Sequence, residues 1–188
     1  MSSTNRGAER VALDAYYTPD PLARKLVGLL DVRGKRVLEP HAGGGAFVRA
    51  LVAAGAHRVL AGDINPQAPI MLAPPAMGVT LAPGVNFLSV AWNDIDIVVG
   101  NPPFSGFKEH VEHALTVAPT VAFLLRLAVM ESASCVRRWA RWPLAEVFVL
   151  AERPSFTGQG AYGFFIFRRG AREIRIRPEW SWKAKEKP

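Results

Sequence analysis

Short apolar runs alternate with helix-like segments along this chain, and this alternation constrains its fold more than any other feature. Continuous apolar runs bounded by turn residues are typical of buried strands. Such runs occupy residues 36–39, 58–62, 95–99 and 120–126. The stretches that predict helices are residues 20–30, 45–54, 107–117 and 128–140. Strands that alternate with helices predict strand–helix–strand units and therefore a mostly parallel sheet.

The last third of the chain predicts an antiparallel edge to this sheet. Strand patterns at residues 145–150 and 162–168 flank a loop rich in Pro, Ser and Gly, which is typical of a long hairpin. Residues 64–83 contain five prolines, and we expect mostly loop there. The pattern as a whole predicts an open, twisted α/β sheet.

The composition is that of one globular domain in a reducing compartment. The 188 residues are 49% hydrophobic and 21% charged, which excludes a disordered chain. No apolar run approaches the roughly 20 residues of a membrane span, and the first ten residues show no apolar segment of a secretory signal. The single cysteine, Cys135, excludes an internal disulfide. We therefore expect a cytoplasmic protein.

Positive charge is concentrated at the end of the chain. The formal net charge is +7, and residues 168–188 hold eight basic and three acidic residues, which is +5 of that total. A second basic cluster consists of arginines 137, 138 and 141 interleaved with Trp139 and Trp142. Clustered positive charge favours a polyanion such as nucleic acid, although a basic tail also serves to keep a protein soluble.

A glycine-rich turn, EPHAGGGAF at residues 39–47, follows the first predicted strand. Its glycines at 43 and 45 let the backbone approach a ligand without an intervening Cβ. Asp63 closes the second strand about 20 residues on, where an acid accepts hydrogen bonds from ribose hydroxyls. The turn lacks the third glycine of GxGxxG, no GxxxxGK(S/T) loop is present, and the Glu39 carboxylate would repel a pyrophosphate. Glu39 suits a cationic group, such as the amino group of S-adenosylmethionine; a glycine turn that binds nothing is the alternative.

A rigid turn directly follows the apolar run at 95–99 and consists of Asn101, Pro102, Pro103 and Phe104. The two prolines fix φ at about −65° and remove two backbone donors. The Asn101 side chain and the Pro102 backbone then offer two carbonyl acceptors, and Phe104 offers a flat face for a ring. This arrangement suits a planar amino group with two hydrogens, such as the exocyclic nitrogen of adenine.

Accepting both N–H groups would localise the lone pair of that nitrogen, which is otherwise delocalised into the ring. The nitrogen would then attack a methyl sulfonium through positioning and electrostatic preorganisation, without a general base. No His or Glu lies beside the turn in the sequence. A base inside a duplex must be flipped out to reach such a site. A proline-rich turn without a ligand is the alternative.

These motifs together resemble class I S-adenosylmethionine-dependent methyltransferases, and within them the adenine-N6 DNA methyltransferases of bacteria and phages. The segments that carry the resemblance are residues 17–19, 39–47, 63, 86–88, 101–104 and 153–158. The resemblance implies a Rossmann-like fold with a mostly parallel seven-stranded sheet and an antiparallel edge hairpin. It implies one catalytic domain over residues 1–168, followed by a basic tail over residues 169–188.

The resemblance also implies roles for single residues. The target base would be held by Asn101, Pro102, Pro103 and Phe104. The cofactor S-adenosylmethionine would be held by Tyr17, Thr18, Pro19, Glu39, Pro40, Gly43, Gly45, Asp63, Ile64, Asn86 and Phe87. Thr18 is expected near the methionine carboxylate, Asp63 at the ribose and Ile64 on the cofactor adenine. Asn86 stands where the family usually has Asp, and Phe156 would pack against the flipped base. No metal is implied. The spacing of His110, Glu112 and His113 predicts a solvated helix face.

Besides Asn86, the chain departs from the family in a second respect. Related enzymes usually carry a target-recognition domain after the last strand, whereas only 21 residues follow Phe167 here. We therefore expect methylation of DNA with low or short sequence specificity, with phosphate contacts from the tail. A partner protein or a second copy of the chain would supply further specificity. No membrane partner is expected.

Other functions share these motifs. An RNA adenine-N6 methyltransferase is the nearest alternative, because the charge of the tail does not distinguish DNA from RNA. Glutamine methylases of release factors also use an Asn-Pro-Pro turn, usually followed by Tyr, and cytosine-N4 enzymes tend to carry Ser in place of Asn101. A non-catalytic nucleic-acid-binding protein on a decayed methyltransferase fold is an alternative of a different class.

Overall fold

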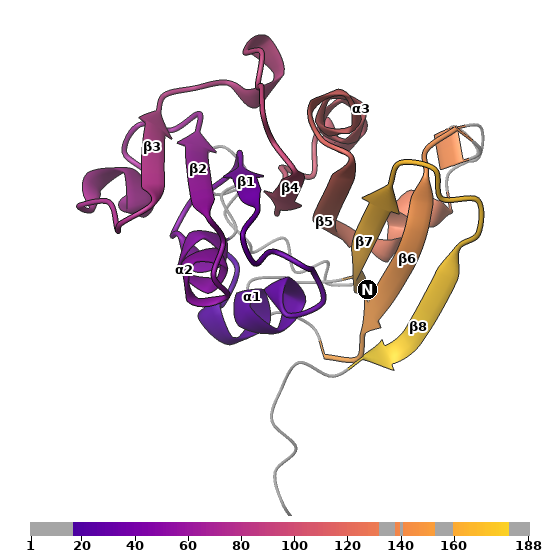
Figure 1. Cartoon of the computed structure of the whole chain (residues 1–188). Coiled ribbons are helices and arrows are strands. Elements are labelled where there is room, and N and C mark those ends of the chain that lie inside the picture. Colours follow the sequence, from indigo (N-terminus) through magenta and orange to yellow (C-terminus); the bar gives the residue numbers. More distant parts are fainter. Residues whose placement is uncertain (1–16, 132–137, 140, 153–159, 181–188) are drawn as a thin grey trace, which may run out of the picture.

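The computed structural model describes residues 17–131, 138–139, 141–152 and 160–180 (Figure 1). The α-helices are α1 (Asp20–Val27), α2 (Ala46–Ala53) and α3 (Phe107–Val117). The strands are β1 (Arg36–Glu39), β2 (Arg58–Asp63), β3 (Val79–Pro83), β4 (Ile97–Gly100), β5 (Thr120–Arg126), β6 (Leu144–Leu150), β7 (Tyr162–Arg168) and β8 (Arg175–Trp180). Short 3-10 helices are η2 (Pro69–Leu72), η3 (Phe87–Ser89) and η4 (Leu127–Met130).

The described strands form one sheet in the order β3-β2-β1-β4-β5-β7-β6-β8. The first five strands in this order run parallel to one another. β7 runs antiparallel to its neighbours β5 and β6, and β8 runs parallel to β6. The expected α/β fold, with a mostly parallel sheet and an antiparallel hairpin, is thereby confirmed. The strand order reverses between β1 and β4, and sheets of this kind bind ligands at the carboxyl ends of the strands beside such a reversal.

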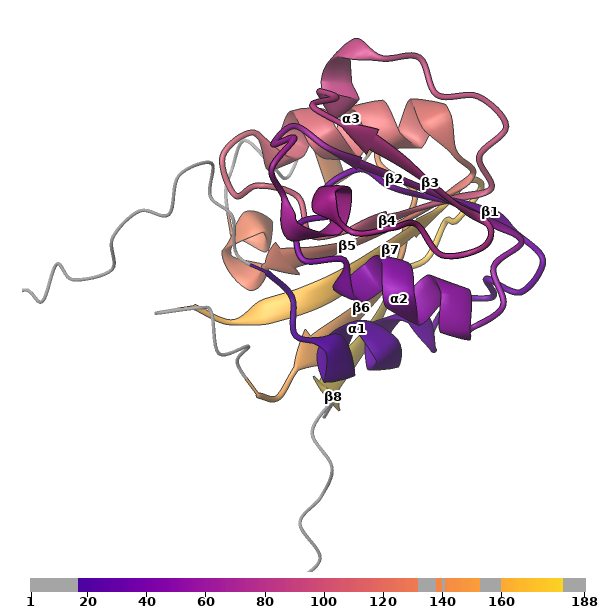
Figure 2. The same cartoon turned by 90° about the vertical axis from the view of Figure 1, so that its left-hand side faces the viewer.

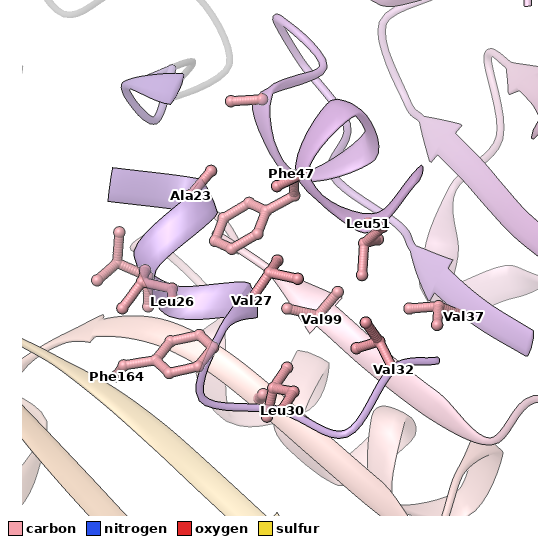
Figure 3. Packing of buried hydrophobic residues seen from close by; sticks show 14 of the residues in the cluster. Ala23, Leu26, Val27, Leu30, Val32, Val37, Phe47, Leu51, Val99 and Phe164 are labelled. Carbon is pink, nitrogen blue, oxygen red and sulfur yellow. The ribbon is translucent and has the colours of Figure 1, made fainter. Parts of the chain in front are cut away.

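Helices cover both faces of the sheet (Figure 2). α1 and α2 pack side by side on one face, and α3 lies on the other. Figure 3 shows Leu26 and Val27 of α1 and Phe47 of α2 gathered near Val99 of β4 and Phe164 of β7. All five side chains are at most 4% exposed. Full burial of one such side chain contributes about 1.5–3 kcal/mol, so this packing fixes the position of the strand ends.

The described residues form eight strands rather than the expected seven, because the sequence pattern reveals neither edge of the sheet. β3 lies within residues 64–83, where the prolines predict a loop, and β8 lies within the expected tail. An edge strand tolerates proline and needs no continuous apolar run. In β8, Ile176 is 57% exposed between Arg175 and Arg177. The basic segment therefore begins as part of the sheet.

Some expected elements have the predicted bounds, namely residues 36–39, 107–117 and 120–126. The N-cap of α1 is Pro19, and no side chain caps this helix. Asp20 instead forms an ion pair with Arg49 of α2 at 2.7 Å, which ties the first two helices together.

The helix expected at 128–140 begins as the short helix η4, and residues 132–137 and 140 lie outside the described part of the chain. The two tryptophans of the second basic cluster pack inward. Trp139 stacks on Phe167 with ring centroids 6.1 Å apart, and Trp142 is 8% exposed. Across the described residues, no helix is both long and apolar enough to cross a membrane.

Candidate functional site

Four neighbouring parallel strands bring polar side chains to one edge of the sheet. β2 ends at Asp63, β1 ends at Glu39 and β5 ends at Arg126, while Asn101 follows the last residue of β4. The parallel register aligns these strand ends. Residues that lie far apart in the sequence therefore meet where the strand order reverses.

Glu39 is buried at this edge, with its side chain only 1% exposed. Its Oε1 accepts a hydrogen bond from the His41 N–H at 3.0 Å, and its Oε2 is buried with no hydrogen-bond partner among the described residues. The carboxylate lies against the Cα of Gly100, where a Cβ would overlap Oε1. A glutamate therefore does lie beside the 101–104 turn, although the sequence order separates the two.

The environment of Glu39 favours a cationic ligand. Burial raises the pKa of its carboxyl well above the ordinary value, and the hydrogen bond from His41 opposes this by stabilising the carboxylate. The negative charge of Asp63 raises the pKa further. A buried carboxylate with an unpartnered oxygen is costly unless a donor reaches it, and a cationic donor satisfies both its charge and its hydrogen bonding.

The glycine turn is fixed by Asp63 and covered by Tyr17. Gly43 has a φ of 46°, and its N–H donates to Asp63 Oδ2 at 2.7 Å. Asp63 Oδ1 accepts from the Asn65 N–H at 2.8 Å, so both carboxylate oxygens shape the backbone here. A Cβ on Gly43 would approach the Tyr17 ring to 2.8 Å. Glycine is required at this position both by its left-handed backbone and by this close ring.

A hydrogen bond joins the 101–104 turn to the N-terminal segment. Asn101 Nδ2 donates to Thr18 Oγ1 at 3.4 Å, and Asn101 Oδ1 is buried. Thr18 therefore lies at the catalytic turn predicted from the sequence. The bond directs the amide nitrogen of Asn101 toward Thr18, and it leaves the carbonyl oxygen as the acceptor end of the side chain. Pro102 is buried, and Phe104 is half-buried.

A pocket of about 300 Å³ lies next to this turn. It is lined by Pro103, Phe104, Phe107, Lys108, Leu125, Arg126, Ala128 and Val129. The Arg126 guanidinium lies over the Phe104 ring, 4.5 Å from its centroid, and Arg126 Nε donates to the Tyr162 hydroxyl at 3.1 Å. Sequence analysis did not select Arg126. The sequence feature that could have identified it is its position at the carboxyl end of a predicted strand, at the same edge of the sheet as the other site residues.

Several expected cofactor residues contribute to the fold near the end of β3. The Asn86 Oδ1 accepts from the Leu88 N–H at 3.0 Å and so caps η3. Phe87 is 2% exposed and belongs to the hydrophobic core, whereas Ile64 is 54% exposed. Phe156, expected to stack on the target base, lies outside the described residues.

His110 and His113 do not form the solvated helix face expected from the sequence. Phe87 packs against α3, with its ring centroid 4.6 Å from that of His113, and the His41 ring lies 4.8 Å from that of His110. Burial lowers the pKa of His41 and of His110, so both rings are neutral at pH 7. Among the described residues, no group of three His, Cys, Asp or Glu side chains is placed to hold a metal ion.

Solved structures resemble this chain in fold, although no family model and no curated protein matches its sequence. A Listeria monocytogenes protein assigned to the class I S-adenosylmethionine-dependent methyltransferases has a TM-score of 0.70 at 10% identity, covering 93% of this chain and 69% of that one. A type I restriction-modification methyltransferase subunit from Streptococcus thermophilus has a TM-score of 0.65 at 15% identity, covering 83% and 45%. The 23S rRNA methyltransferase ErmE has a TM-score of 0.61 at 18% identity, covering 83% and 70%. The chain thus has the Rossmann-like fold of class I methyltransferases.

Proposed function

We propose that this protein methylates the exocyclic N6 amino group of adenine in DNA, with S-adenosylmethionine as the methyl donor and with little demand on sequence. The observation that carries the proposal is the contact between two sites. The buried carboxylate of Glu39 lies against Gly100, directly before the Asn101 side chain. The residues that we propose for a cationic group and those that we propose for a planar amino group thus adjoin at one edge of the sheet.

The residues at the end of β1 fit the cofactor. Glu39 Oε2 is a buried acceptor with no hydrogen-bond partner among the described residues, and it would receive the ammonium group of the methionine part. The turn over residues 43–45 and the Asp63 carboxylate would hold the remainder. S-adenosylmethionine supplies an electrophilic methyl group on a sulfonium. Tyr17, which packs on Gly43, would cover this end of the site.

The 101–104 turn would hold the base. The Asn101 Oδ1 and the Pro102 carbonyl would accept the two N–H groups of adenine, and this localises the lone pair on the nitrogen. Phe104 would stack on the ring. Because the Asn101 amide is oriented by Thr18, its oxygen needs no reorganisation as charge develops on the amino group. The new bond from nitrogen to the methyl carbon would replace the bond from that carbon to sulfur, so that S-adenosylhomocysteine leaves and the methylated nitrogen releases one proton to water.

Adenine in RNA is a second candidate substrate. The similarity in fold extends to ErmE, which is named for 23S rRNA, as well as to a restriction-modification subunit. Both candidates require the same chemistry at Asn101, and they differ only in the polynucleotide. A protein can distinguish RNA from DNA by contacts to the 2′-hydroxyl of RNA.

The test is methyl transfer from radiolabelled S-adenosylmethionine to duplex DNA, single-stranded DNA, RNA and bulk protein. We expect label in DNA. Label in RNA alone would select the second candidate, and label in protein alone would contradict both. Binding of S-adenosylhomocysteine, measured by calorimetry, distinguishes a working cofactor site from a decayed scaffold. A decayed scaffold would bind neither S-adenosylmethionine nor S-adenosylhomocysteine.

Substitution Gly100→Ala is expected to weaken cofactor binding by about tenfold, because the added Cβ displaces the Glu39 carboxylate. The matched control is Gly62→Ala on β2, the strand on the other side of β1, where a Cβ meets no atom closer than 3.6 Å. Calorimetry with S-adenosylhomocysteine measures the effect, and thermal melting shows that both variants are folded. Equal affinity in the two variants would remove Glu39 from the cofactor site.

The basic segment that contains β8 is expected to contribute phosphate contacts. β8 runs parallel to β6 and ends beside Leu150, so its end lies about three strand spacings of 4.8 Å from Arg126. Deleting residues 170–188 would remove a strand of the sheet. Neutralising the charge of single side chains is the better experiment, because it leaves that strand in place. The double substitution Arg175→Gln and Arg177→Gln changes two exposed side chains of β8 itself.

This double variant is expected to bind DNA more weakly. Its plot of log affinity against log salt should also be less steep, by up to about 2 in slope. Fluorescence anisotropy at four salt concentrations gives the slope. The control neutralises Arg33 and Arg58, two exposed arginines near the amino ends of β1 and β2. A slope that changes equally in both double variants would show that β8 has no special part in binding.

A further inference from the structure

The pocket beside Phe104 combines an apolar lining with two basic side chains. Six of its lining residues are apolar, and the other two are Lys108 and Arg126. The described lining contains no acidic residue. We propose that Lys108 and Arg126 bind the phosphate group of the nucleotide whose base enters this pocket. This inference rests on the proposed function and deepens it, because it makes a nucleotide, rather than a free base or a protein side chain, the unit that the site recognises.

The apolar part of the pocket suits a flat ring. Phe104 and Phe107 contribute aromatic surface, and Leu125 and Val129 contribute aliphatic surface. Aromatic side chains stack on nucleobases without regard to sequence. A volume of about 300 Å³ is at the lower end of ligand pockets and therefore suits one nucleotide unit rather than several.

The basic side chains come from two elements on either side of the turn. Arg126 is the last residue of β5, and Lys108 is the second residue of α3. The Lys108 Nζ lies 5.9 Å from the centroid of the Phe107 ring. A phosphate is the anion that accompanies every base of a nucleic acid, so a flat apolar pocket with two cations at its wall matches both parts of a nucleotide.

Arg126 is held in position before any substrate binds. Its guanidinium lies over the Phe104 ring, and its Nε donates to the hydroxyl of Tyr162, which is 1% exposed. A guanidinium has five N–H donors in a planar fork, and the bond to Tyr162 uses one of them. Arginine in such a fixed orientation binds phosphate in a bidentate manner, which lysine cannot reproduce.

The same contact links phosphate binding to the base. Because the Arg126 guanidinium lies on Phe104, a phosphate bound by Arg126 would be placed next to the ring on which the base stacks. The phosphate would then position the base relative to Asn101. Loss of Arg126 should therefore weaken substrate binding more than it slows the transfer step.

The test compares Arg126→Gln and Lys108→Gln with the wild-type protein on two short single-stranded oligonucleotides that contain one adenine. One has a normal backbone, and the other has a neutral methylphosphonate 5′ of the adenine. On the normal substrate we expect KM to rise about tenfold or more in each variant, with a smaller change in kcat and unchanged affinity for S-adenosylhomocysteine. On the neutral substrate the variants and the wild type should differ little. Arg126→Lys should recover part of the loss, because it keeps the charge without the fork.

Lys35→Gln serves as the matched control, because this exposed lysine precedes the amino end of β1. A KM that is unchanged in both variants would overturn the inference, and so would an equal rise in KM on the neutral substrate. If the wild-type protein transfers no methyl group, the proposed function fails. Anisotropy of the same two labelled oligonucleotides then still measures whether Lys108 and Arg126 contact that phosphate.

Discussion

Replacing Asn101 by alanine is expected to reduce methyl transfer by about 100- to 1000-fold, the effect of removing one preorganised hydrogen-bonding group from a transition state. The Asn101 oxygen is buried and its amide is oriented by Thr18, so the acceptor is in place before the base binds. Cofactor affinity should change by less than threefold, because Glu39, rather than Asn101, is the proposed partner of the ammonium group. Single-turnover transfer to DNA and calorimetry with S-adenosylhomocysteine measure the two quantities.

Two further variants sharpen this prediction. Thr18→Ala removes only the group that orients the Asn101 amide, and it should lower the rate by about tenfold. Thr116→Ala, near the end of α3, removes a hydroxyl that bonds to the His113 carbonyl and should leave the transfer rate unchanged. An Asn101→Ala protein that keeps more than a tenth of wild-type activity would show that the 101–104 turn does not hold the reacting amino group.

Replacing Glu39 by glutamine is expected to stabilise the cofactor-free protein and to weaken cofactor binding at the same time. The folded-state pKa of Glu39 is raised by burial, so its carboxyl costs stability as pH rises above the ordinary value of about 4.3 toward the raised one. Glutamine carries no charge at any pH. At pH 7 the variant should therefore unfold at a higher denaturant concentration than the wild type, and the difference should shrink toward pH 4.

Cofactor affinity should move in the opposite direction. Losing a charged partner for the ammonium group weakens binding by about tenfold to a hundredfold. In the wild type, affinity should rise with pH until the carboxyl is ionised, because only the carboxylate attracts the cation. Glu39→Gln should lose this part of the pH dependence. Urea titration and calorimetry between pH 5 and 8 test both effects, and a variant that is less stable yet binds normally would assign Glu39 a purely structural role.

The central part of the fold could be predicted from the sequence because its signals are local. The α3 and β5 bounds follow from apolar periodicity, and the shared edge of the strand ends follows from the alternation of strands and helices, which predicts parallel strands. The edge strands β3 and β8 could not be predicted in this way, since partial burial leaves no apolar run. β8 is recognised as a strand by its pairing with β6 rather than by its composition.

The candidate site could be predicted only where residues are near one another in sequence. The glycine turn and the 101–104 turn each form a local motif. The contact of Glu39 with Gly100 depends on the pairing of β1 with β4, and no pattern within either strand encodes that pairing. Arg126 could not be predicted for the same reason. In the sequence it is a single basic residue after an apolar strand, and only the fold brings Phe104 and Tyr162 into contact with it.

The most direct test of the central claim identifies the atom that receives the methyl group. Unmethylated DNA is incubated with the protein and S-adenosylmethionine, digested to nucleosides and analysed by mass spectrometry against standards of the methylated bases. The prediction is N6-methyladenine, which should be absent when Asn101→Ala replaces the wild type. Methylation of cytosine N4 or of a ring nitrogen of adenine, surviving in the Asn101→Ala variant, would contradict it.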